Sequence, residues 1–252
     1  MGAPSIDPPA RALRSSWDRD ALSRLDPARV RDGLLVALTL SSGAVDAISW
    51  LALGKVFSAF MTGNLVFVGL RAGGAAGPSV PRVLTALLAF AAGAAVSGRI
   101  VGRAEESGVV WPRRVTAALA AALVAQAAFL ALWVSVGGRP SSGTATALIA
   151  LSALAMGVQA TAVFALGVRA IVTTAATGLL AVLMADLAGW RQPPAERRRL
   201  ATCIVGLLAG AIVGATLVVH ARSCAAAFPL VVSGLAVLTA ALAFPQDAEH
   251  GT

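Results

Sequence analysis

The chain has 252 residues, of which 58% are hydrophobic and 13% are charged, and its formal net charge is +8. A soluble domain carries about 25% charged residues, because its surface must be hydrated. The composition therefore excludes an ordinary soluble enzyme and predicts an integral membrane protein. The basic charge does not indicate nucleic-acid binding, because the arginines flank apolar stretches and form no separate basic domain.

The predicted elements begin with residues 1–32, a polar and Arg-rich segment that lacks the apolar core of a signal peptide. We expect a partly disordered tail, and its positive charge predicts that it lies in the cytoplasm. Near its end, Asp26 and Pro27 predict the start of a helix, since Asp is a favoured N-cap and Pro fits the first helical position.

Six stretches that follow are apolar and have about the 20 residues needed to cross a bilayer. They are 33–54, 83–102, 112–136, 143–166, 200–220 and 226–244. Two more apolar stretches, 57–70 and 170–188, are shorter or richer in polar residues, and residues 245–252 form a short C-terminal tail. The sequence predicts an all-α polytopic transmembrane helix bundle with six full spans and two short or interrupted segments.

The motifs recur in the same order, which predicts an internal duplication with repeats at 33–136 and 137–244. Matching pairs are Gly54 and Gly167, Thr62-Gly63 and Thr177-Gly178, residues 92–98 and 209–215, and Trp111-Pro112 and Phe228-Pro229. If the short segments do not cross the membrane, the repeats are inverted; if they cross, there are eight crossings and the repeats are parallel. Counts of positive charge do not separate the two topologies. We favour six spans, because inverted repeats with interrupted segments recur in transporters.

Asp46 lies near the middle of the first span, and Gln159 has nearly the same place in the second repeat. An aspartate at that depth costs on the order of 3 kcal/mol, so it should face the interior, a partner or water. Asp46 is therefore either a contact for an ion or substrate or a structural hydrogen-bonding group. The two short segments carry Gly, Thr and Asn, which favour unwound backbone around a binding site but also allow close helix packing.

We predict that these polar residues share one interior cavity near the midplane. The candidate substrate-binding residues are Asp46, Thr62, Gly63, Asn64, Gln159, Thr173, Thr174, Thr177 and Gly178. Cys203 and Cys224 have no metal-binding spacing, and we expect no catalytic residue, no metal and no cofactor. Glycines at four-residue spacing, as in 206–214, predict tight helix packing, and small-residue faces of this kind also suit a homo-oligomer.

Several of these motifs resemble the YoaK-like family of small bacterial multi-pass membrane proteins. The resemblance rests on Gly43 to Ala47, on Met61-Thr62-Gly63-Asn64-Leu65 and on residues 155–160 with the threonines that follow, and it covers roughly residues 33–244. The family usually has Asn after the Gln, where this chain has Ala160. The resemblance implies a membrane location and gives weight to these motifs, and it implies no substrate.

We therefore expect a multi-pass protein of a bacterial inner membrane with its N-terminus in the cytoplasm and the lipid bilayer around it. The leading functional hypothesis is a transporter or permease for a small molecule or ion, with a polar site between the two repeats. The alternative is a non-transporting membrane scaffold or accessory subunit. A transporter needs a cavity around Asp46, whereas a scaffold would pack this region shut.

Overall fold

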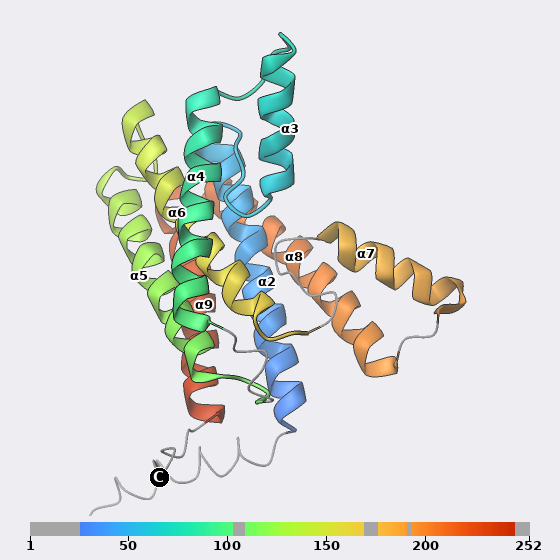
Figure 1. Cartoon of the computed structure of the whole chain (residues 1–252). Helices are drawn as coiled ribbons and strands as arrows, with labels where there is room; N and C mark the ends of the chain where they lie inside the picture. Colours follow the sequence, from blue (N-terminus) through green and yellow to red (C-terminus); the bar gives the residue numbers. More distant parts are fainter. Residues whose placement is uncertain (1–25, 103–108, 169–175, 191–192, 245–252) are drawn as a thin grey trace, which may run out of the picture.

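The computed structural model describes residues 26–102, 109–168, 176–190 and 193–244, and these residues form helices and loops without a strand (Figure 1). The helices are α2 (Pro27–Ala52), α3 (Met61–Ala72), α4 (Val80–Val101), α5 (Arg113–Ser135), α6 (Ser142–Phe164), α7 (Ala176–Ala185), α8 (Pro194–His220) and α9 (Ala227–Ala243). A π-helical turn, η2 (Asp186–Trp190), follows α7, and a 3-10 turn, η3 (Arg222–Cys224), precedes α9.

Within the described residues, six helices are long and apolar enough to cross a bilayer, which confirms the predicted polytopic bundle. They are α2, α4, α5, α6, α8 and the helix that ends at Ala243. The 12 residues of α3 reach only about 18 Å, well short of the roughly 30 Å of a hydrocarbon core. The predicted helix start is also confirmed: Pro27 is the first helical residue and the Asp26 side chain accepts a hydrogen bond from the Ala28 amide at 3.0 Å.

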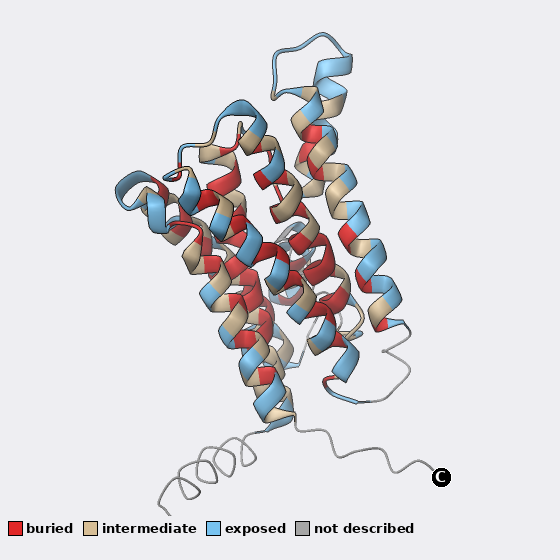
Figure 2. Ribbon diagram, turned by 90° about the vertical axis from the view of Figure 1, so that its left-hand side faces the viewer, coloured by how far each residue is buried: buried red, intermediate tan, exposed pale blue. Residues whose placement is uncertain are grey.

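Two helix pairs pack most extensively, α2 with α8 and α4 with α6. Glycines let these backbones approach closely, as membrane helices require in the absence of a strong hydrophobic driving force. In Figure 2 the buried residues gather where the helices face one another, and the exposed residues lie outside. α9 packs on α2, and α5 packs on α6.

The glycine contacts of the two pairs follow one register. A side chain added at Gly43 of α2 would meet the backbone of Leu207 in α8, and one added at Gly157 of α6 would meet the backbone of Phe90 in α4. Gly157 lies 114 residues after Gly43, and Leu207 lies 117 residues after Phe90. The reciprocal contacts have the same two offsets. The first of them is Gly93 of α4, which faces the backbone of Leu154 in α6.

The matching contact in the other pair is Gly210 of α8, which faces the backbone of Leu40 in α2. Gly210 lies 117 residues after Gly93, and Leu154 lies 114 residues after Leu40. In Figure 1, α2 and α8 run in one direction through the bundle, and α4 and α6 run in the other. Both observations support an inverted duplication, which stays a prediction. In this packing register Asp46 corresponds to Ala160, and Gln159, one residue away, corresponds to Val45.

An ion pair joins the starts of α2 and α8. The guanidinium of Arg199 lies 3.6 Å from the carboxylate of Asp32 and 3.7 Å from that of Glu196. The starts of α2 and α8 therefore lie on the same side of the bundle. The corresponding residue of α4, Arg82, donates a hydrogen bond to the hydroxyl of Ser142 at the start of α6.

Candidate functional site

The chain turns back on itself between α2 and α3. Gly54 (φ 101°) and Lys55 (φ 61°) adopt left-handed backbone conformations, which redirect the chain after α2. We call residues 53–60 the re-entrant segment, because the chain returns along α2 before α3 leads it away (Figure 1). Met61 to Asn64 form the first turn of α3, so this motif is helical, and the irregular backbone expected there lies just before it.

Asp46 holds the re-entrant segment in place. Its Oδ1 accepts hydrogen bonds from the amides of Ser58 (2.8 Å) and Ala59 (2.7 Å), and its Oδ2 accepts one from the amide of Phe60 (3.1 Å). Three successive amides directed at one carboxylate form an anion-binding nest, and the positive end of α3 lies next to it. The nest explains how a carboxylate is tolerated within a membrane span.

Other polar side chains fix the same segment. The Asn64 side chain accepts a hydrogen bond from the Phe57 amide (3.0 Å) and donates one to the Phe57 carbonyl (2.7 Å). The hydroxyl of Ser58 lies 2.6 Å from those of both Ser49 and Ser152. Ser152 belongs to α6, so the segment is tied to the second half of the chain as well. The serines did not appear among the candidates, although serine within an apolar span signals a hydrogen bond between helices.

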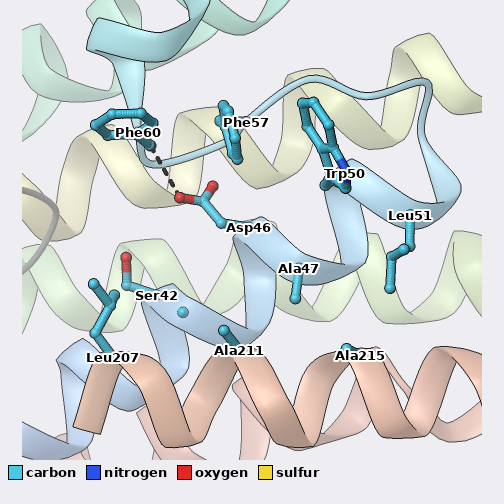
Figure 3. Close-up of a pocket in the computed structure, with 11 residues that line it drawn as sticks. Ser42, Asp46, Ala47, Trp50, Leu51, Phe57, Phe60, Leu207, Ala211 and Ala215 are labelled. Atoms are coloured by element: carbon cyan, nitrogen blue, oxygen red, sulfur yellow. Dashed lines mark hydrogen bonds between the residues drawn. The ribbon is translucent and has the colours of Figure 1, made fainter. Parts of the chain in front are cut away.

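A cavity of about 470 Å³ opens beside Asp46. One wall is the face of α2 from Ser42 to Leu51, the second is the α8 face with Leu207 and Ala211, and the re-entrant segment supplies the rest (Figure 3). Small residues on α8 make the space, because they leave the facing backbone uncovered. The volume lies within the range of pockets for small organic ligands.

Aromatic rings form the wall next to the carboxylate. The Trp50 and Phe57 rings stack with centroids 5.0 Å apart, and Phe60 meets Phe57 edge to face at 5.3 Å. Gly63 makes this arrangement fit, since a Cβ atom there would lie 2.7 Å from the Phe60 ring. The polar side chains in the lining are Ser42 and Asp46. The cavity is therefore apolar and aromatic with one acidic group.

The structure brings Asp46, Gly63 and Asn64 to the re-entrant segment, and of these Asp46 lines the cavity. Gln159 is buried elsewhere, where its amide donates a hydrogen bond to the Leu38 carbonyl at 3.1 Å. Thr62, at the start of α3, is exposed and is not part of the lining. The common cavity expected for these residues therefore contains fewer of them than predicted.

The candidates of the second repeat lie apart from this cavity or outside the described residues. Thr177 and Gly178 are exposed in the first turn of α7, which packs on α8. Thr173 and Thr174 lie outside the residues that the structure describes. A substrate-binding role for these four positions stays a prediction.

Among α2, α5, α6 and α9, the described residues leave little space. A second cavity, of about 10 Å³, lies among Gln126, Ser152 and their apolar neighbours, which is scarcely room for one water molecule. Close to it, Ser233 links the Ser41 hydroxyl (2.9 Å) and the Gln126 amide (3.3 Å). The space among these four helices is thus nearly filled, whereas the larger cavity lies between α2, the re-entrant segment and α8.

The predicted small-residue face of α8 is used within the chain. Gly206, Gly210 and Gly214 all lie against the backbone or side chains of α2. The face through which we expected a homo-oligomer is therefore covered on α8, and a homo-oligomer through another face stays a prediction.

Six apolar spans with a half-length helix that starts inside the bundle define the class, a multi-pass α-helical membrane protein. A family model described as "Protein of unknown function (DUF1275)" matches residues 34–242, and the chain belongs to that family. The chain is also similar to the UPF0700 transmembrane protein YoaK of Bacillus subtilis (strain 168), with 39% identity over 162 residues, 64% of this chain and 69% of the relative. No solved structure gives a significant match.

Proposed function

We propose that this protein is a small transporter or permease whose substrate site is the cavity beside Asp46. The observation that supports this proposal most is the cavity itself: about 470 Å³, at the level of a midspan carboxylate and next to a re-entrant segment. Broken or short helices near the midplane are where membrane transporters bind their substrates. A scaffold or accessory subunit would not require a cavity at this point.

The second candidate is a non-transporting scaffold or accessory subunit. It is favoured by the three amide hydrogen bonds of Asp46, because these give the carboxylate a complete structural role. Under this hypothesis the cavity is a lipid-filled groove between α2 and α8, and water does not reach it.

Access of water to the cavity separates the two candidates. In a chain with Cys203 and Cys224 replaced by Ser, an Ala47→Cys variant places one thiol on the cavity wall. A transporter exposes this thiol to a water-soluble, membrane-impermeant maleimide, because its site must open to water on at least one side. The matched control is Leu88→Cys on α4, whose side chain is 70% exposed on the outside of the bundle and should face lipid.

Labelling of position 47 but not of position 88 supports the transporter. A scaffold predicts that neither thiol reacts with the impermeant reagent and that both react with an apolar maleimide. Rapid labelling of both positions by the impermeant reagent would mean that the preparation is unfolded, which circular dichroism and gel filtration detect.

We also place the starts of α2 and α8 in the cytoplasm, with the protein in the bacterial inner membrane. Arginines crowd this side, including Arg197, Arg198 and Arg199, and positive charge marks cytoplasmic loops. An Ala195→Cys variant, at an exposed position in the first turn of α8, should resist impermeant reagents added to intact cells and react after the cells are opened. Labelling in intact cells would reverse the orientation.

A further inference from the structure

Two features of the cavity determine which ligand fits it: the negative charge of Asp46 and the apolar, aromatic character of the wall. Asp46 is the acidic group of the lining, and the lining contains no basic residue. Among the described residues, none of the ion pairs involves Asp46. Its charge therefore has no side-chain counterion in the described part of the protein.

The amide nest offsets only part of this charge. An α-helix N-terminus is equivalent to roughly half a positive charge, so about half of the negative charge of the carboxylate is left over. A carboxylate also has about four acceptor sites, and the three amides occupy three of them. One acceptor site on Oδ2 is left for a ligand that donates a hydrogen bond, such as a protonated amine.

The aromatic wall supplies the other half of the recognition. Trp50, Phe57 and Phe60 line the cavity next to the carboxylate (Figure 3). Faces of aromatic rings attract cations, most strongly where water is excluded. The remaining wall, from Leu51 to Leu207 and Ala215, is aliphatic and suits an apolar body.

From these features we infer that the cavity binds a small hydrophobic monocation, a quaternary or protonated amine that carries an apolar group. The cation lies between Asp46 and the aromatic rings, and the apolar group lies along α8. This inference rests on the proposed function, because it names the substrate class of the same cavity. Two lining residues, Leu51 (48% exposed) and Phe60 (38% exposed), reach the surface of the protein, so the ligand enters past them.

A pair of compounds with the same shape and different charge tests the inference. Phenyltrimethylammonium and tert-butylbenzene differ in one atom, nitrogen for carbon, and in one positive charge. Titration calorimetry on the full chain in lipid nanodiscs should detect saturable binding of phenyltrimethylammonium. An excess of tert-butylbenzene should change the dissociation constant of phenyltrimethylammonium by less than about threefold. The carboxylate and the aromatic rings attract the positive charge, which tert-butylbenzene lacks.

Three variants locate the binding. Asp46→Asn should weaken phenyltrimethylammonium binding about tenfold or more, and Phe60→Leu about fivefold. Trp50→Leu, which leaves the Asp46 hydrogen bonds intact, should weaken it to a similar extent and covers the case in which Asp46→Asn does not fold. The matched control is Phe164→Leu, which changes an exposed aromatic residue on α6. This variant should bind phenyltrimethylammonium with the same affinity as the wild-type protein.

The inference is overturned if the unchanged protein shows no saturable binding, or if tert-butylbenzene displaces the cation. It is also overturned if Trp50→Leu, or a folded Asp46→Asn, binds with unchanged affinity. If one of these results is obtained and the impermeant maleimide still labels position 47, the inference about the ligand is wrong but the proposed transport function is retained. Conversely, the cation could bind saturably while the impermeant maleimide fails to label position 47. That result would support the ligand class and contradict the transport proposal.

Discussion

In the first half of the chain, the segment before α3 has its amides bound by a carboxylate from α2, whereas in the second half the position that matches this carboxylate carries Ala160. The two halves otherwise share the register in which α2 meets α8 and α6 meets α4. The shared part is built from glycine contacts between long helices, and the part that differs is built from the polar groups that hold the segment before α3. The common framework thus depends on close packing, while the first half is distinguished by a few polar side chains around Asp46.

Removing the carboxylate should make the first half more like the second, and it should cause the largest loss of stability. Asp46→Ala leaves the amides of Ser58, Ala59 and Phe60 without their acceptor. Hydrogen bonds to a charged group are worth about 1.5–3 kcal/mol each, and part of that is recovered from water or relaxation, so we expect a loss of about 3 kcal/mol in the free energy of unfolding. Thermal denaturation in detergent measures it.

The control for this variant is Asp26→Ala, at the start of the same helix. Asp26 is exposed and accepts one amide hydrogen bond, so its removal should cost about 1 kcal/mol or less. Equal losses for the two variants would mean that the nest contributes no more than an ordinary helix cap.

The shared framework predicts equal effects in the two halves. An added methyl group in Gly210→Ala or Gly93→Ala would meet the backbone of the facing helix, at Leu40 or Leu154. Each variant should lose about 2 kcal/mol of unfolding free energy, because neither backbone can move without separating the helices. Gly234→Ala is the matched control, since no atom lies within 4 Å of the added methyl group and α-helix propensity even favours alanine.

Chemical denaturation of the three variants measures these differences. Similar losses at positions 93 and 210, with none at 234, would support the duplication. A loss at only one of the two would show that the packing is not equivalent in the two halves.

The smallest effect concerns the arginines at the starts of α8 and α4. Arg199 is 11% exposed and lies near Asp32 and Glu196, whereas Arg82 reaches the Ser142 hydroxyl at an exposed position. Arg199→Gln should cost about 1 kcal/mol, since Asp32 keeps Arg31 as a partner, and Arg82→Gln less than about 0.5 kcal/mol. A larger loss for Arg82→Gln in the same denaturation assay would reverse this difference between the halves.

The sequence predicts the spans well because a bilayer demands long apolar helices, and it predicts Asp46 as exceptional because a midspan carboxylate is costly. It does not predict that Asp46 binds Ser58, Ala59 and Phe60, since the amides of a folded-back segment look the same in any sequence. It predicts that Gln159 has nearly the place of Asp46 in the second repeat, and the helix packing puts it one residue from that place. The cavity depends on small residues of α8 facing α2, which a pattern of glycines and alanines indicates only as close packing.

Amide hydrogen exchange at Ser58, Ala59 and Phe60 tests most directly whether Asp46 holds the re-entrant segment. This segment carries Phe57 and Phe60 of the cavity wall, so the proposed site depends on it. In the unchanged protein these three amides should be protected, and Asp46→Ala should speed their exchange about a hundredfold while leaving the α4–α6 contact as it was. Unprotected amides in the unchanged protein, or the same exchange rates in both proteins, would contradict the hydrogen-bonded nest and the cavity built on it.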